Sequence, residues 1–523
     1  MATKKKKAGN EASSSRKMTV ADLIKQEKIA EVDLLEDARA KYYEYGIAVL
    51  EDRALADFRD GQMPVTRRNA FSAYDMGIRS TGRFAKAARI VGDAIGRFHP
   101  HGDSSIYNAL VKMVNGNSVI ALFQGEGNWG NMSDPGNAAM RYTECRLSKF
   151  SDEVLFNKFY TPVMEKAPNY DGSFEEPLLL PAVLPVVLMN GSYGIAPGAV
   201  SAIPSFTTSS VIKLLRLLYS GTELSDKLMY KTLEFTTLYG GIEVEPKTKE
   251  AKAERMNVFR TTTGRVQMKS KIKWHEESRT LTVTAFANVG SLTVKAAKTD
   301  DDKKGKKPKK GLLDKLMDIE GVDAARDDSG TADRYATVTI IINKKATPKM
   351  VETILKYIKR KLLRSSENYV LNFTERYMKE DGQASAHVRA MSLVTMMEAW
   401  LKWRVKLERA ACQYWMDEAK KRIRELELKI LAVDNKELII RALNDKKRDM
   451  DQLEEWLAAQ LKITKAEAAF IFNMKVRQLR ALEKDALVAK KKEEEALYKT
   501  LAQRQKTPLP FMLKQLDGLE TLK

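Results

Sequence analysis

The sequence predicts an α+β protein of several domains. The chain has 523 residues and is too long to fold around a single hydrophobic core, since domains usually contain about 100 to 200 residues. Apolar and polar residues alternate in RTLTVTAF (279–286) and YATVTIII (335–342), which is typical of strands. From about Ser392 to Lys506, Gly and Pro almost vanish and apolar residues recur every three or four positions, which predicts long helices.

The helical section predicts an antiparallel arm. One stripe comprises Ala419, Ile423, Leu426, Ile430 and Val433, and a returning stripe comprises Leu479, Leu482, Ala486 and Ala489. Between the two stripes, Thr464 and Glu467 have the spacing of a capping box ahead of the apolar run AAFIF. We therefore expect two long helices that pack on each other, with a small helical knob at the tip.

Charge and cysteine content narrow the class of protein. The formal net charge is +20, which favours a polyanionic partner, nucleic acid first; alternatively, the charge only keeps the surface solvated. Cys145 and Cys412 are the only cysteines and lie far apart, so neither a disulfide framework nor a thiolate zinc site is expected. These features predict a reducing, cytoplasmic location.

Three segments stand out by their composition. The apolar run at 178–189 contains Pro181 and Pro185 and is shorter than the roughly 20 residues of a membrane span, so it is predicted to be buried core or strand. Residues 1–30 are basic with no apolar stretch and predict a disordered arm. The segment TDDDKKGKKPKKG (299–311) predicts a mobile loop whose lysines contact DNA or simply stay solvated.

A helix-turn-helix is predicted before the glycine-rich segment. KAARIVGDAIG (86–96) is helical in pattern, and Asp103 or Ser104 can cap a second helix. That helix would bury Ile106, Ala109, Leu110 and Met113 and expose Ser105, Asn108 and Lys112. Such a pair can present backbone amides to a phosphate, although many helix pairs bind nothing.

Several polar residues are candidates for chemistry. His99 and His101, two of the four histidines, could be metal ligands, a catalytic pair or a grip on a phosphate. The glycines at 125, 127 and 130 lack the GK[ST] order of a nucleotide loop. Arg141 beside Tyr142 is more suggestive, although a lone Arg-Tyr pair in a chain with 18 tyrosines is usually structural.

An ordered series of motifs carries a family resemblance. The series is RALADFRDGQMPVTRR (53–68), RIVGDAIGRFHPHGDSSIYNALVKM (89–113), QGEGNWG (124–130), AAMRYTECRLSK (138–149), NYDG (169–172) and NGSYGIAPGAVSAIP (190–204). It is similar to the breakage and reunion subunit of type IIA DNA topoisomerases, which include the gyrase A subunit, its topoisomerase IV counterpart and viral medium subunits. A weaker match follows at 466–487.

The resemblance implies a division of the chain. Residues 31–177 would form a winged-helix DNA-cleavage domain, residues 178–390 a strand-containing tower domain, and residues 391–523 a coiled-coil arm that ends in a helical dimerisation gate. The dimer contact would lie in the knob at 434–475.

The resemblance also implies roles for single residues. Tyr142 would be the nucleophile that forms a 5′-phosphotyrosine, and Arg141 would stabilise the phosphate charge. Arg53 and His99 would line the scissile phosphate, with His99 near its ordinary pKa of about 6.5 and able to share or donate a proton. The implied DNA contacts are His101, Ser104, Ser105, Arg67, Arg68 and Ile195, the last as a wedge between base pairs. No residue is predicted to bind a metal.

Departures and missing motifs shape the expected function. Met63 and Thr66 stand where cellular members have Lys and His, and Asn108 replaces an acid, which is expected to weaken quinolone binding. No ATPase motif is visible, so ATP and Mg²⁺ are expected on a separate large subunit, with this chain as a homodimer. The sequence stops at Lys523, from which we expect relaxation and decatenation rather than gyrase-type supercoiling.

Two other classes remain open at this point. An architectural DNA-binding protein would use the same helix pair and basic surface without a nucleophile. A metal-dependent hydrolase would use the two histidines of the HPH sequence. Covalent capture of cleaved DNA distinguishes the topoisomerase from both.

Overall fold

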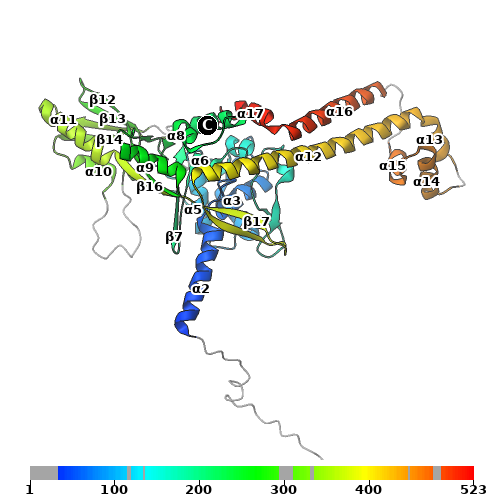
Figure 1. Cartoon of the computed structure of the whole chain (residues 1–523), viewed down its shortest axis with the longest axis horizontal. Coiled ribbons are helices and arrows are strands. Elements are labelled where there is room, and N and C mark those ends of the chain that lie inside the picture. The colour runs from blue at the N-terminus through cyan, green and yellow to red at the C-terminus, as the bar shows by residue number, and fades with distance from the viewer. Residues whose placement is uncertain are drawn as a thin grey trace, which may run out of the picture.

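The computed structural model describes residues 33–114, 119–133, 136–293, 310–329, 335–445, 448–474 and 484–522. The predicted basic arm at 1–30 and nearly all of the lysine-rich loop at 299–311 lie outside these ranges. A central body carries a sheet-rich extension on one side, a long helical arm on the opposite side and a single projecting helix, α2 (Figure 1). In the described part, no helix is long and apolar enough to cross a membrane.

The predicted helix pair is present in the body. The first elements are α2 (Leu34–Val49), the π-helical turn η1 (Leu50–Ala54), α3 (Pro64–Asp75), α4 (Ala87–Arg97) and α5 (Asp103–Val114). Ile106, Leu110 and Met113 of α5 are buried and Asn108 is exposed, as the 3.6-residue period predicts. Beside the pair lies an antiparallel sheet in the order β1 (Ala85–Lys86), β3 (Glu144–Leu147), β2 (Phe123–Glu126).

The apolar run at 178–189 is buried throughout, which confirms the prediction of core. From Leu180 onward its apolar residues share one cluster with Phe98 and Ile106 of the helix pair region, so the core continues across the predicted boundary at residue 177. The adjoining elements are η2 (Ser151–Leu155), η3 (Thr161–Val163), β4 (Lys166–Pro168), β5 (Glu175–Pro177), α6 (Val186–Asn190), α7 (Thr208–Tyr219), α8 (Asp226–Thr232) and α9 (Lys249–Arg260).

Two larger sheets follow, and together with the helices they confirm a mixed α and β architecture. In sheet order the first has β6 (Ser192–Ala196), β7 (Ala199–Ile203), β16 (Arg364–Val370), β11 (Thr263–Lys269), β10 (Ile242–Glu243), β9 (Phe235–Thr236) and β8 (Ser205–Phe206). The second has β12 (Lys271–His275), β13 (Thr280–Ala285), β15 (Val338–Ile342) and β14 (Val322–Asp327), with α10 (Leu312–Met317), α11 (Pro348–Tyr357) and η5 (Ile358–Leu362). The strands β13 and β15 lie within the two segments predicted as strands.

Two hairpins reach the segment that carries Arg53. The hairpin β17 (Asn372–Met378) and β18 (Ala384–Ala390) is antiparallel, and the Arg376 guanidinium donates to the Glu51 carbonyl in η1. The hairpin of β6 and β7 packs on η1 from another side through Gly194. A Cβ at Gly194 would lie 1.8 Å from the Ala54 carbonyl oxygen, so the close approach requires a glycine.

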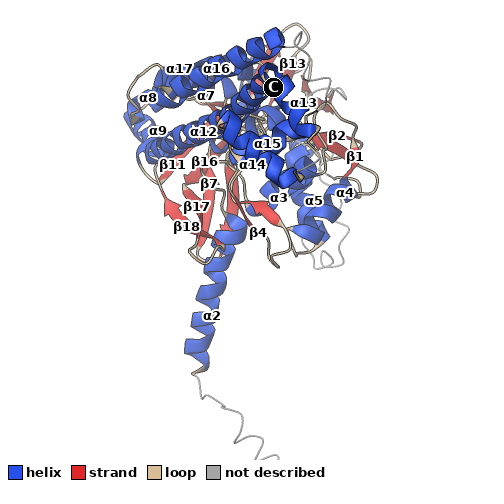
Figure 2. Cartoon of the chain, turned by 90° about the vertical axis from the view of Figure 1, so that its right-hand side faces the viewer, coloured by secondary structure: helices blue, strands red, loops and turns tan. Residues whose placement is uncertain are grey.

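The predicted arm consists of α12 (Leu393–Asp434) and α16 (Lys484–Lys506), which run side by side in opposite directions (Figures 1 and 2). The knob at its tip contains α13 (Lys436–Leu443), α14 (Met450–Leu461) and α15 (Lys465–Phe472), and α17 (Pro508–Leu519) returns to the body. The capping box of Thr464 and Glu467 is present at the start of α15.

Polar pairs one heptad apart join the two helices of the arm. The pairs are Asp434–Lys484 at 2.5 Å, Glu427–Lys491 at 3.0 Å, Lys420 over the Tyr498 ring at 5.6 Å and Gln413–Gln505 at 2.9 Å. Each step moves seven residues down α12 and seven up α16, as the register of an antiparallel coiled coil requires. We call these four pairs the ladder.

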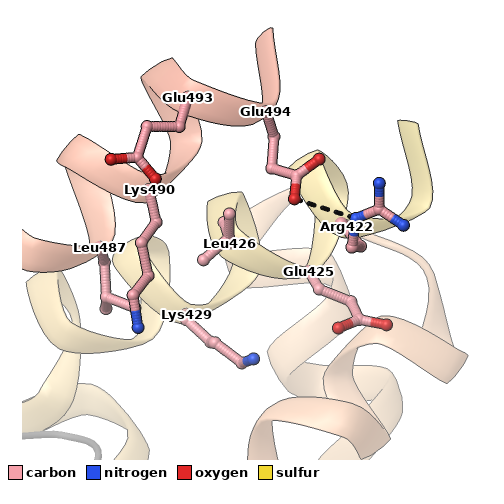
Figure 3. Close-up of a pocket in the computed structure, with 8 residues that line it drawn as sticks. All are labelled: Arg422, Glu425, Leu426, Lys429, Leu487, Lys490, Glu493 and Glu494. Carbon is pink, nitrogen blue, oxygen red and sulfur yellow. Dashed lines mark hydrogen bonds and ion pairs between the residues drawn. The ribbon is translucent and has the colours of Figure 1, made fainter. Parts of the chain in front are cut away.

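On the side of the α12–α16 contact opposite the ladder, the two helices leave a groove. Arg422 pairs with Glu494 at 3.0 Å, and beside this pair lies a groove of about 550 Å³ that Leu426 and Leu487 also line (Figure 3). The predicted returning stripe is partly wrong: Ala486 and Ala489 are exposed, because α16 turns Leu487 toward α12 instead. Leu479 and Leu482 lie outside the described residues.

At the root of the arm, a buried polar cluster joins α12 to the body. Arg404 donates to Glu408 at 3.0 Å and to the Tyr160 hydroxyl at 2.7 Å, and that hydroxyl donates to Glu408 at 2.7 Å. Arg504 of α16 donates to the other oxygen of Glu408. Burial alone would raise the pKa of Glu408, but the two arginines outweigh it and lower the pKa, so the carboxylate is charged inside the core.

Candidate active site

Tyr142 lies on an exposed turn that the helix pair holds in place. The backbone amides of Ala87 and Ala88, at the start of α4, donate to the carbonyls of Thr143 and Met140 at 2.9 and 3.2 Å. These amides have no partner within their own helix, so the turn satisfies them. The Tyr142 side chain is 64 % exposed, and the Arg141 guanidinium lies 4.6 Å from the centre of its ring.

Tyr107 of α5 supports the same turn from below. Its buried hydroxyl donates to the Ala138 carbonyl at 2.7 Å and lies 2.9 Å from the Thr143 hydroxyl. The glycine-rich segment has a packing role here, because a Cβ at Gly125 would lie 2.5 Å from the indole nitrogen of Trp129. The turn is therefore rigidly placed while the Tyr142 hydroxyl stays accessible.

A second cluster gathers around His99, which is 6 % exposed. Arg68 Nη1 lies 2.8 Å from Nδ1 of His99, and the His101 ring is 4.6 Å away, edge to face. A guanidinium can only donate, so Nδ1 must be the acceptor and the proton of the neutral ring is on Nε2. In the described part of the chain, no residue accepts a hydrogen bond from Nε2, which leaves that donor free.

The prediction that His99 titrates near its ordinary value is wrong. Burial is the main cause that lowers the pKa of His99 to about 3, and the charges of Arg68, His101 and Arg53 lower it further. The ring is therefore neutral at physiological pH and offers a hydrogen bond, not an acidic proton. The sequence could not show this because Arg68 lies 31 residues away.

The prediction that Arg67 contacts DNA disagrees with its position. Arg67 is 3 % exposed, and its guanidinium pairs with the buried Asp60 at 2.6 Å. Asp60 also accepts from the backbone amides of Gln62 and Leu180. Arg67 therefore fixes the fold, while its neighbour Arg68 points to His99 and pairs with Glu176.

The other predicted DNA contacts lie at exposed positions. His101, Ser104 and Ser105 are exposed at the start of α5, and Arg53 is exposed at the end of η1. Ile195 is 64 % exposed on β6, opposite the partly exposed Val200 of β7. An ordinary core position for Ile195 is thereby ruled out.

The structure brings some predicted residues together and keeps others apart. Arg53, Arg68, His99 and His101 form one cluster, whereas within the described ranges no hydrogen bond or ion pair joins Tyr142 to it. Among the same residues, no group of three or more His, Cys, Asp or Glu side chains could hold a metal ion. The sequence reasoning missed Glu176, which no local motif marks.

Comparisons with known proteins identify the family of the chain. Residues 53–517 match the family of the DNA gyrase/topoisomerase IV A subunits. The chain is 30 % identical over 473 residues to the DNA gyrase A subunit of Nocardioides sp., covering 88 % of this chain and 48 % of that protein. It is 30 % identical over 462 residues to the DNA topoisomerase 4 A subunit of Neisseria gonorrhoeae, covering 85 % and 57 %.

A third relative, the DNA gyrase A subunit of Helicobacter pylori strain J99, is 30 % identical over 469 residues, covering 88 % of this chain and 52 % of that protein. The chain spans about half the length of the curated relatives it matches. The family match covers most of the chain, including the turn of Tyr142 and the cluster around His99. This chain therefore belongs to the family of DNA gyrase/topoisomerase IV A subunits.

Proposed function

We propose that this chain is the catalytic breakage and reunion subunit of an ATP-dependent type II DNA topoisomerase. One observation carries the proposal: an accessible tyrosine stands beside an arginine on a turn that a helix-turn-helix holds rigidly. Such a helix pair is suited to lie along a DNA backbone. Membership of the family supports the same assignment.

The proposed reaction is a transesterification at a DNA phosphate. The Tyr142 oxygen attacks phosphorus, loses its proton and forms a 5′-phosphotyrosine, while the 3′ oxygen leaves as a hydroxyl after protonation. Arg141 supplies a planar pair of donors to the phosphate oxygens as charge develops. The neutral His99 donates a hydrogen bond through Nε2 and Arg53 adds positive charge; reversal of the same step reseals the strand.

We place ATP hydrolysis and Mg²⁺ binding on a separate large subunit. Among the described residues no group of three or more His, Cys, Asp or Glu side chains could hold a metal ion, and no step above involves the ion. When bound by the partner, Mg²⁺ would neutralise charge on the phosphate and the leaving oxygen. ATP would drive the passage of a second duplex and would not drive the cleavage itself. Relaxation and decatenation of DNA would be the outcome.

We propose further that the chain is a homodimer that closes through the knob of the arm. Ile440 and Leu443 of α13 and Met450 at the start of α14 are exposed apolar side chains on this knob. Exposed apolar residues gathered on one part of a protein are typical of an interface. Deletion of residues 434–475 should give monomers in analytical ultracentrifugation, and dimers of unchanged stability would place the contact elsewhere.

Covalent capture tests the proposed reaction. The chain, purified with its large subunit from the native source, would be incubated with supercoiled DNA and Mg²⁺ and then denatured with detergent. We expect protein bound to the 5′ ends of both strands. DNA that is bound with strong salt dependence but never cleaved would favour an architectural DNA-binding protein instead, and cleavage without a covalent adduct would favour a hydrolase.

A further inference from the structure

The carboxylate of Glu176, which is not among the predicted site residues, is connected to His99 through the side chain of Arg68. Glu176 of β5 accepts two hydrogen bonds from Arg68, from Nε at 2.5 Å and from Nη2 at 2.7 Å. The remaining terminal nitrogen of Arg68, Nη1, is the one that reaches Nδ1 of His99. The three side chains come from α3, the segment after α4, and β5, so the fold and not a local motif assembles them.

The geometry leaves the guanidinium little freedom. A bidentate pair with a carboxylate fixes the plane of an arginine as well as its position. Both partners are largely shielded from water, with side-chain exposures of 18 % for Arg68 and 10 % for Glu176, so water competes weakly for these hydrogen bonds. With the fork of Arg68 held in this way, Nη1 is presented to His99 in one orientation.

We propose that Glu176 is a positioning residue that acts through Arg68 to hold His99 as the Nε2–H tautomer. Resting on the proposed function, this assigns Glu176 the task of keeping a neutral hydrogen-bond donor aimed at the DNA phosphate. A carboxylate–arginine–histidine chain achieves this without charging the ring, because the charge of Glu176 is neutralised by Arg68. Direct contact with a carboxylate would instead favour a protonated imidazolium.

The state of the His99 ring can be measured without any cleavage assay. The chain has only four histidines, His99, His101, His275 and His387, so ¹⁵N-histidine labelling gives four ring systems that single His→Gln variants assign. Long-range ¹H–¹⁵N spectra distinguish the two tautomers and the charged ring. We expect His99 to be the Nε2–H tautomer and to stay uncharged down to pH 5.

Glu176→Gln should release this arrangement. Glutamine keeps the size of the side chain but loses the second acceptor and the charge, so His99 should sample both tautomers. The double variant Arg68→Leu/Glu176→Leu removes the pair without leaving a buried charge, and it should also free the ring if the single variant folds poorly. Glu243→Gln breaks the similarly buried pair with Arg255 and should leave His99 unchanged.

Cleavage then tests whether the tautomer matters. With the large subunit present, Glu176→Gln should lower the rate of adduct formation about tenfold, as the loss of a supporting partner commonly does. In a His99→Ala background the same change should have almost no further effect, because Glu176 acts through His99. Glu243→Gln should cleave at the rate of the unchanged protein.

Two results would overturn the inference. An Nδ1–H tautomer of His99 in the unsubstituted protein, or a His99 spectrum that Glu176→Gln leaves unchanged, would show that Glu176 does not hold the ring as the Nε2–H tautomer. Equal effects of Glu176→Gln with and without His99 would show a role in stability alone. A third result separates the two proposals. If even the unsubstituted protein forms no adduct while His99 has the expected tautomer, the proposed reaction is wrong but the role of Glu176 in positioning His99 is supported.

Discussion

The body and the arm both use ion pairs, but in opposite surroundings. In the body, Arg67–Asp60 and Arg68–Glu176 are largely excluded from water; the first pair fixes the fold, and the second holds Arg68 at the candidate site. In the arm, the ladder pairs Asp434–Lys484 and Glu427–Lys491 are partly exposed along the seam. Buried pairs tolerate no loss of one partner, whereas exposed pairs contribute little each and are screened by salt.

This difference separates two tasks. The pairs of the body fix the geometry of buried side chains, and the cost of burying charge is offset by several hydrogen bonds to each pair. The ladder contributes register, because a slip of the two helices by one heptad would bring Lys420 opposite Lys491. We therefore expect the stability of the body to depend on pH and on the loss of one residue of a buried pair. The stability of the arm should depend on the salt concentration.

The largest effect should come from the root of the arm. Glu408→Ala leaves the buried Arg404 without its carboxylate and should lower the free energy of unfolding by about 3–5 kcal/mol. Chemical denaturation measures this loss. Glu418→Ala, on the same helix but in an exposed pair with Lys421, is the matched control and should change stability little; similar losses in both variants would erase the contrast.

A clash at η1 should come next. Gly194→Ala places a methyl group against the Ala54 carbonyl and should cost about 3 kcal/mol of stability, with displacement of Arg53 and reduced cleavage. Gly92→Ala in α4, where a Cβ would meet nothing within 4 Å, should be neutral or slightly stabilising. Full cleavage by Gly194→Ala would mean that η1 does not position Arg53.

Acid should destabilise the body through His99. Its pKa in the folded chain is about 3, below the value of about 6.5 in an unfolded chain. Between these values the unfolded chain binds a proton that the folded chain does not, so stability falls as pH falls from 6.5 toward 3. At pH 5 this amounts to about 2 kcal/mol.

Denaturation at pH 7.5 and pH 5 measures this difference. In His99→Gln the part due to the ring should disappear, so this variant should lose less stability on acidification than the unchanged protein. An identical pH dependence in both proteins would mean that His99 titrates normally.

The smallest effect should come from the ladder. Reversal of one charge by Lys491→Glu should cost about 0.5 kcal/mol and should shrink as salt rises. The double variant Glu427→Lys/Lys491→Glu should restore part of the stability, because it re-forms the cross-helix pair but loses the pairs with Arg424 and Glu495. A loss of stability that salt does not reduce would mean that the ion pairs of the arm are shielded from water, like those of the body.

Secondary structure was predicted from the sequence better than the surroundings of individual side chains. The helix pair, the strands at 279–286 and 335–342, the buried run at 178–189 and the capping box at Thr464 all follow from local periodicity or spacing, and the structure confirms them. Local pattern cannot decide which of two adjacent arginines is buried. Arg67 turns inward because Asp60 and the amide of Leu180 form a polar site in the core.

The site was predicted from motifs and corrected by contacts. Tyr142 and Arg141 are adjacent in the chain, so their proximity needs no fold. The pKa of His99 depends on its burial and then on Arg68, and Arg68 is paired with Glu176, 108 residues further along. The exposure of Ala486 reflects the rotation of α16 about its axis, which the ladder sets and an alanine stripe cannot reveal.

The most direct test of the account is the adduct at Tyr142. Tyr142→Phe removes one oxygen from an exposed ring, so folding, dimerisation and DNA binding should survive while the covalent adduct is lost. Tyr193→Phe, at a tyrosine that is 67 % exposed on β6, should still form the adduct with the large subunit and Mg²⁺. Detergent-trapped DNA on the Tyr142→Phe protein would contradict the assignment of the nucleophile.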